Sequence, residues 1–272
     1  LVDCRYDVIQ VFKFYDWRNC IMMHCNDQLY LPGDNGIGIV LIHGISSGCA
    51  QMIPLGKMLN DYGYSVHCVN IAGHGTYPQE LLRTSFEDMI DKASYDYDMM
   101  KRHYDKVYIG GLSMGGCLAL ALASKRDDID GIFSISAPLD MVPGGFVTAE
   151  YPEDMISFHR DIGGKVGIAR WYHIHYEDIA VRVCKELINL MDYLKTDGVI
   201  ENIKCPSYIA QSQDDAMADP TSCYRIMERL TVDDKYLYNP LDAGHNMAFN
   251  EGRFGLIQNL IAYLNVKDHI LE

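Results

Sequence analysis

Six short runs rich in Val, Ile and Tyr recur along the chain, and longer amphipathic segments separate them. Their polar and apolar residues alternate only weakly, which is typical of strands that are buried on both faces of a sheet. The runs occupy 38–44, 65–71, 106–111, 131–136, 206–212 and 235–240. Strands in regular alternation with helices predict an α/β fold with a mostly parallel central sheet flanked by helices.

The intervening segments carry apolar residues at helical spacing. We predict helices over 50–63, 85–104, 116–126, 219–230 and 252–266, and expect the first 30 residues to add one or two strands, including 8–16. The interval 139–204 contains no convincing strand. We expect a small helical cap insertion there, followed by a crossover helix near 180–194. The predicted division is therefore a core of 1–138 and 196–272, with 139–195 as cap plus crossover helix.

Charge and cysteine content narrow the possible partners and location. The formal net charge is −14, so phosphate backbones repel the chain and nucleic-acid binding is not expected. Nine scattered cysteines without a C-x-x-C pair argue against a zinc site and a disulfide framework. They suit a reducing cytoplasm, where we expect the protein to reside. The apolar stretches are too short to predict a transmembrane segment, and the N-terminus shows no secretory signal.

The stretch "YIGGLSMGGCLALALA" places Ser113 in a G-x-S-x-G turn between a strand and a helix. A serine nucleophile needs this strand–turn–helix context, because the tight turn exposes its hydroxyl group. Gly111 and Gly115 supply positions without a Cβ atom, which such a turn requires. The first N–H groups of the following helix would face negative charge that develops at the site. We therefore interpret Ser113 as a nucleophile.

An oxyanion also needs hydrogen-bond donors. The stretch "LIHGISSG" ends a buried strand and enters a loop, which suits a backbone N–H donor at Ile45. The residue after the nucleophile, Met114, would supply the second donor. We expect His43 to be a hydrogen-bonded structural residue under this loop.

The general base should be a histidine late in the chain. His245, in "LDAGHNMAF", alone falls in a glycine-containing loop between the last strand and the last helix. His173 and His175 have a spacing that could bind a metal, but no third ligand is evident, so a packed or solvated pair is the better interpretation.

The carboxylate that orients the base should follow the strand "PSYIAQS". Asp214, Asp215 and Asp219 lie there, and Asp215 is our first choice with Asp214 second. Asp219 precedes Pro220 at a helix start, which favours a role as N-cap. Asp242 lies too close to His245 in sequence and is better read as a loop residue. The order serine, aspartate, histidine is that of α/β-hydrolases.

These segments, with "GHGTYPQEL" and "ISAPL", resemble bacterial carboxylesterases and monoacylglycerol lipases of the α/β-hydrolase superfamily, from about Ile37 to Leu264. The resemblance implies Ser113 as nucleophile, Asp215 as acid and His245 as base, with oxyanion donors at Ile45 and Met114. It also implies a small cap over an apolar acyl pocket. The insertion departs from the family in its residues, which leaves the substrate open.

The chemistry expected from these residues is hydrolysis of a small-molecule carboxylic ester with an apolar acyl group, without metal or cofactor. A thioesterase or acyltransferase with the same triad remains an alternative, as does a non-catalytic ligand-binding protein of this fold. Apolar cap residues could shelter an acyl chain or simply fix the cap to the core. They are Phe146, Tyr151, Met155, Ile156, Phe158, Trp171 and Tyr172.

Overall fold

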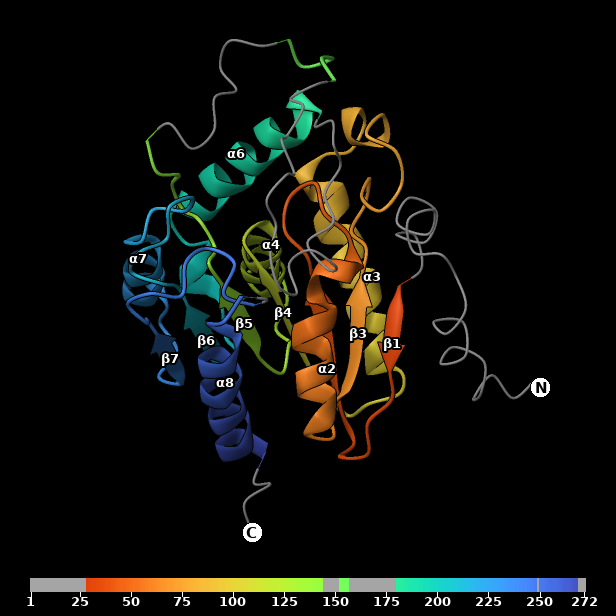
Figure 1. The fold of residues 1–272 in the computed structure, drawn as a ribbon, viewed down its shortest axis with the longest axis vertical. Coiled ribbons are helices and arrows are strands. Elements are labelled where there is room, and N and C mark those ends of the chain that lie inside the picture. Colours follow the sequence, from red (N-terminus) through yellow and green to blue (C-terminus); the bar gives the residue numbers. More distant parts are fainter. Residues whose placement is uncertain (1–27, 144–151, 157–179, 249, 269–272) are drawn as a thin grey trace, which may run out of the picture.

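A single seven-stranded sheet forms the centre of the protein (Figure 1). The computed structural model describes residues 28–143, 152–156, 180–248 and 250–268. The strand order is β1-β3-β2-β4-β5-β6-β7; β1 pairs antiparallel with β3, and every other neighbouring pair is parallel. The strands are β1 Leu29–Leu31, β2 Ile37–Ile42, β3 Ser65–Val69, β4 Lys106–Leu112, β5 Ile132–Ile135, β6 Ser207–Ala210 and β7 Lys235–Tyr238. The predicted α/β fold and all six predicted strands are confirmed.

The helices follow the predicted order along the chain. The segment predicted as one helix over 50–63 begins as a 3₁₀ turn, η2, before α2 continues it. The helices are η2 Cys49–Met52, α2 Ile53–Asp61, η3 Glu80–Leu82, α3 Phe86–Lys101, α4 Met114–Ala123, α6 Val181–Lys195, η4 Ile200–Asn202, α7 Ser222–Arg229 and α8 Arg253–Asp268.

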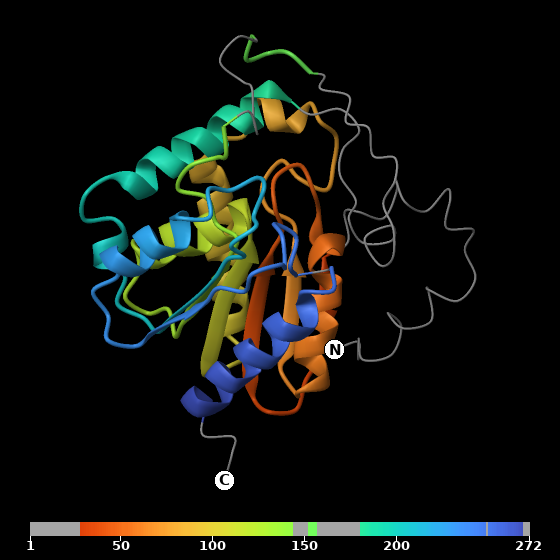
Figure 2. The same cartoon turned by 60° about the vertical axis from the view of Figure 1, so that its left-hand side comes forward.

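Helices cover both faces of the sheet and so make three layers (Figures 1 and 2). Helices α2 and α8 pack on one face, and α3, α4, α6 and α7 pack on the other. Along β2, Val40 and Ile42 face the second group, whereas Ile39 and Leu41 face α2 and α8. All four side chains are fully buried, which explains why the strand sequence alternates so weakly.

The start of α3 links the core to the crossover helix α6. Ser85 and Asp88 form a capping box, in which each side chain accepts a backbone N–H of the other residue. Glu186, a buried residue of α6, accepts the backbone N–H of Phe86 at 3.1 Å. The first turn of α3 is thereby stabilised from within and from α6.

The crossover helix lies where the sequence predicts it, as α6. Before it, the structure describes residues 139–143 and 152–156 of the insertion. The residue pair Ile156 and Ala180 forms an isolated antiparallel bridge just before α6. Several predictions fall outside the described residues: the strand over 8–16, the histidines His173 and His175, and the cap side chains Phe146, Tyr151, Phe158, Trp171 and Tyr172. The division into core and cap remains a prediction.

The described part of the chain also shows the state of its cysteines and the character of its helices. Six of the nine cysteines lie in it, and all six are buried free thiols. None of the helices in the described ranges combines the length and apolarity that crossing a bilayer requires.

Candidate active site

Ser113 lies in the turn between β4 and α4, with an unusual backbone conformation. Its φ of 56° and ψ of −118° lie in a region that L-residues rarely adopt, at a cost of about 1–3 kcal/mol. The surrounding backbone holds it there. Its N–H donates to Ile135 O of β5 at 2.7 Å, and its carbonyl accepts from Gly116 N at 2.9 Å. A strained strand-to-helix turn of this kind is the one that a serine nucleophile requires.

The neighbouring glycines are a steric requirement of this turn. A Cβ atom at Gly111 would lie 2.5 Å from Ile42 O, and one at Gly115 would lie 2.3 Å from the same oxygen. Real Cβ atoms do not approach a backbone oxygen so closely. The absence of both side chains therefore allows the serine turn to pack directly against the end of β2, as the sequence predicts.

The loop after β2 passes beside Ser113. A Cβ atom built on Gly44 would lie only 3.6 Å from the Cβ of Ser113. The backbone on both sides of Ile45 is fixed by side chains, since Gly44 N donates to Gln51 Oε1 at 2.6 Å and Ser46 N donates to His74 Nε2 at 3.1 Å. Met114 is the first residue of α4, where helical N–H groups lack partners within the helix. Met114 thus follows Ser113 directly, and the loop that carries Ile45 passes beside Ser113 at Gly44.

Two buried histidines support this loop with hydrogen bonds. His43 Nδ1 donates to Gly44 O at 2.8 Å and its Nε2 accepts from Ile71 N at 3.3 Å. His74 Nδ1 donates to Ala72 O at 3.0 Å, which leaves Nε2 to accept the N–H of Ser46. Burial lowers the pKa of His43 to about 3 and that of His74 to about 4. Both rings are therefore neutral, and His43 is the hydrogen-bonded structural residue that the sequence predicts.

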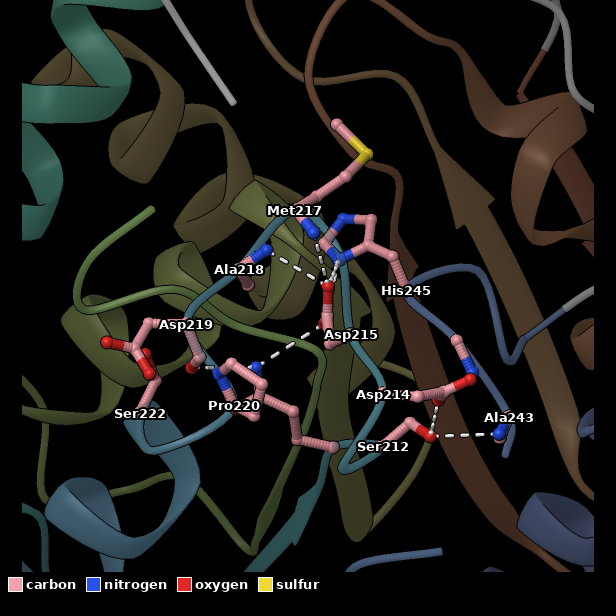
Figure 3. A network of polar contacts seen from close by, with 12 residues as sticks. Ser212, Asp214, Asp215, Met217, Ala218, Asp219, Pro220, Ser222, Ala243 and His245 are labelled. Atoms are coloured by element: carbon pink, nitrogen blue, oxygen red, sulfur yellow. Dashed lines mark hydrogen bonds and ion pairs between the residues drawn. The ribbon is translucent and has the colours of Figure 1, made fainter. Parts of the chain in front are cut away.

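His245 and Asp215 form a buried pair on the loops after β7 and β6 (Figure 3). His245 Nδ1 lies 2.9 Å from Asp215 Oδ2 and 3.0 Å from Oδ1. The carboxylate also accepts the N–H groups of Met217 at 2.9 Å and Ala218 at 3.0 Å. Because Nδ1 donates to the carboxylate, the lone pair of Nε2 is left to accept a proton.

The other candidate carboxylates take different positions. Asp214 Oδ1 accepts from Gly244 N at 2.8 Å and from the hydroxyl group of Ser212, so this side chain contacts the backbone of the histidine loop. Asp242 is an exposed loop residue. The N-cap prediction for Asp219 is wrong: α7 begins at Ser222, and the Asp219 carboxylate instead accepts the N–H and hydroxyl of Thr221 in the turn before it. The turn that contains Pro220 delays the start of the helix.

The groups predicted from the sequence thus lie on the same side of the sheet, at the carboxyl ends of its parallel strands. Ser113, Ile45, Asp215 and His245 follow β4, β2, β6 and β7, and the carboxyl ends of parallel strands lie at the same edge. Ser113 Oγ makes no hydrogen bond to His245 among the described residues. Catalytic hydrogen bonds of this kind often tighten only when substrate is bound.

Sequence reasoning did not identify His74 or Ser212 as part of this site. His74 stands in the "GHG" that carried the family resemblance, so its motif was visible, but its contact with Ser46 in the loop after β2 was not. Ser212 offered no sequence signal beyond its position at the end of a strand.

Known proteins match this chain over most of its length. The Hydrolase_4 family, described as serine aminopeptidase, S33, matches residues 36–152. A thermostable monoacylglycerol lipase of Bacillus sp. strain H-257 is 27% identical over 213 residues, which are 78% of this chain and 84% of that protein. A carboxylesterase of Bacillus subtilis strain 168 is 25% identical over 231 residues, covering 85% of this chain and 93% of that protein.

Solved structures share the same fold. A metagenome-derived lipolytic enzyme, from work on LipS and LipT, superposes with a TM-score of 0.75 and 22% identity, over 89% of this chain and 98% of the other. At that identity the likeness supports the fold alone. The chain thus has the α/β-hydrolase fold, and the curated relatives support a hydrolase that acts on esters, similar to a monoacylglycerol lipase and a carboxylesterase.

Proposed function

We propose that this protein hydrolyses carboxylic esters through an acyl-enzyme on Ser113, with His245 as base, Asp215 as orienting acid, and the N–H groups of Ile45 and Met114 as oxyanion donors. The buried His245–Asp215 pair carries the proposal, because it leaves Nε2 free to accept a proton at the sheet edge where Ser113 lies. The side chain of Asp215 is fully buried and that of His245 is 9% exposed, so solvent competes little for their hydrogen bond.

The reaction proceeds in two halves. His245 Nε2 takes the proton of Ser113 Oγ as this oxygen bonds to the ester carbonyl carbon, and the two N–H groups stabilise the oxyanion. When the intermediate collapses, the bond to the alcohol oxygen breaks and His245 returns the proton to the leaving alcohol. In the second half His245 takes a proton from water, which attacks the acyl carbon and releases the acid, and Ser113 recovers its proton.

The relatives and the insertion support a proposal for the substrate class. Curated relatives are a monoacylglycerol lipase and a carboxylesterase, which favours short- to medium-chain acyl esters or monoacylglycerols. We propose that the insertion at 139–195 forms a cap over the acyl group. Within its described part, Met155 and Ile156 contact the start of α6: the carbonyl of Met155 accepts from Val181 N at 3.0 Å, and Ile156 forms a bridge with Ala180.

Covalent labelling tests the nucleophile. A fluorophosphonate should label the folded protein, and Ser113→Ala should abolish both labelling and ester turnover. The matched control is Ser136→Ala, because Ser136 is another buried serine with left-handed backbone (φ 51°), at the end of the neighbouring strand β5. It should keep labelling. Undiminished turnover in Ser113→Ala would refute the proposed function.

Substrate preference is measured with 4-nitrophenyl esters of increasing chain length beside monoacylglycerols. Preference for short acyl groups indicates an esterase. Preference for acyl chains of about eight carbons or more indicates a lipase-like role, since each buried CH₂ group contributes about 0.8 kcal/mol.

A further inference from the structure

Besides the bond between His245 and Asp215, a second set of hydrogen bonds connects the loops that carry these two residues (Figure 3). Gly244 N donates to Asp214 Oδ1 at 2.8 Å, and Ala243 N donates to Ser212 Oγ at 2.8 Å. The Ser212 hydroxyl in turn donates to Asp214 Oδ1. The two backbone N–H groups that directly precede His245 are thus both held by one pair of side chains.

These bonds act on a loop that has no regular secondary structure. Residues 239–248 contain neither a helix nor a strand, and Gly244, with a φ of 60°, is a glycine that by itself could adopt many other backbone conformations. The amide of Asn250 donates to the carbonyl of Ala243 from the other side. Fixing residues 243 and 244 determines where the Cα of His245 lies, and hence where its imidazole lies relative to the Asp215 carboxylate.

We propose that Asp214, together with Ser212, is a positioning residue for the base, which sets the place of His245 while Asp215 sets the orientation of its ring. The proposal rests on the proposed role of His245. It assigns different tasks to two adjacent aspartates: one contacts the imidazole, and the other contacts the peptide backbone that carries it. Displacement of a base by about 1 Å can lower the rate on the order of a hundredfold, so hydrogen bonds that fix the position of His245 affect turnover directly.

Asp214 acts on the histidine loop through its hydrogen bonds and not through its charge. Asp214 is exposed, so solvent screens its charge from His245. The bonds from Gly244 N and from Ser212 Oγ both end on the same oxygen, Oδ1. An asparagine at this position offers an amide oxygen to both donors, so Asp214→Asn keeps both hydrogen bonds and removes only the charge. Asp214→Ala removes both.

The experiment compares steady-state kinetics of Asp214→Ala, Asp214→Asn and Asp242→Ala, each well below its unfolding temperature. Asp242 is an exposed aspartate of the same loop and serves as the matched control. We expect Asp214→Ala to lower kcat about tenfold or more with KM changed less than about twofold, because the loss falls on the transition state. Asp214→Asn should retain about half of kcat or more, and Asp242→Ala should match the parent.

A double-mutant cycle supplies a second measurement. Because Ser212 and Asp214 act as one unit, the decrease in kcat for Ser212→Ala with Asp214→Ala should be well below the product of the two single decreases. Independent effects would overturn the proposal. So would an Asp214→Ala variant with parental kcat, or equal losses for the alanine and asparagine variants.

Failure of the proposed function gives a different result. In that case Ser113→Ala retains turnover, or the parent protein has none. If Ser113→Ala is inactive and Asp214→Ala is as fast as the parent, the proposed function stands and the positioning role of Asp214 is refuted.

Discussion

Replacing His74 by glutamine should reduce the loss of stability that this protein undergoes in mild acid. His74 Nε2 accepts the N–H of Ser46, and its Nδ1 donates to Ala72 O, so the fold requires the neutral ring. Protonation at Nε2 would remove the acceptor and place a charge in a fully buried position. Glutamine can offer an amide oxygen to Ser46 N but does not titrate.

The magnitude follows from the difference in pKa between folded and unfolded chains. An unfolded histidine has a pKa of about 6.5, and burial lowers that of His74 to about 4. The folded pKa is depressed, so the stabilisation is present above pH 6.5 and is lost as the pH falls towards 4. Between pH 7.5 and pH 5 this histidine removes about 2 kcal/mol from the free energy of unfolding.

Other histidines contribute in the same direction. Burial lowers the pKa of His43 to about 3 and that of His67 to about 4. The parent protein should therefore lose several kcal/mol of unfolding free energy between pH 7.5 and pH 5, and His74→Gln removes the share that comes from His74. The proximity of His74 also lowers the pKa of His43, so replacing His74 also reduces the loss of stability that comes from His43.

The assay is urea unfolding followed by circular dichroism at pH 7.5 and pH 5, with the free energy of unfolding extrapolated to water. His74→Gln should be less stable than the parent at pH 7.5, because the bond to Ala72 O is lost, and should lose about 2 kcal/mol less on acidification. The control is His103→Gln, at an exposed histidine just after α3. An unchanged pH dependence in His74→Gln would refute the reasoning.

Two substitutions at the site give further tests. Asp215→Asn should lower kcat by about 10⁴, as does the analogous change in serine proteases, and far more than Asp214→Asn; equal effects in steady-state kinetics would exclude Asp215 as the orienting acid. Gly115→Ala should destabilise the protein by more than about 3 kcal/mol in thermal or urea unfolding, because its Cβ would lie 2.3 Å from Ile42 O. Gly198→Ala, where nothing lies within 4 Å and only the positive φ opposes the side chain, should cost about 1–2 kcal/mol.

The fold was predictable from local patterns. Strands such as β2, which are buried on both faces, appear in the sequence as continuous apolar runs, and the helix predicted over 85–104 contains α3. The ends of elements were less predictable. The stretch at 219–230 suggested a helix capped by Asp219, but the turn at Pro220 delays α7 to Ser222, since a local signal cannot show how far a turn extends.

The choice between Asp214 and Asp215 shows the limit of sequence reasoning at the site. The two residues are adjacent, have the same chemistry and follow the same strand. Which one contacts His245 depends on the path of the loop after β6, where Met217 N and Ala218 N hold the Asp215 carboxylate towards the imidazole. The resemblance to a family favoured Asp215, but chemistry alone could not separate the two.

The sequence by itself determined the α/β architecture, the strained serine turn between β4 and α4, and the order of serine, aspartate and histidine along the chain. These depend on periodicity and on glycine positions, which are local properties. Only the tertiary structure decided that His74 supports the backbone at Ser46 and that Asp214 supports the backbone at Gly244. Each of these contacts joins residues about 30 positions apart, and hydrogen bonds across such separations depend on how the packed strands bring their loops together.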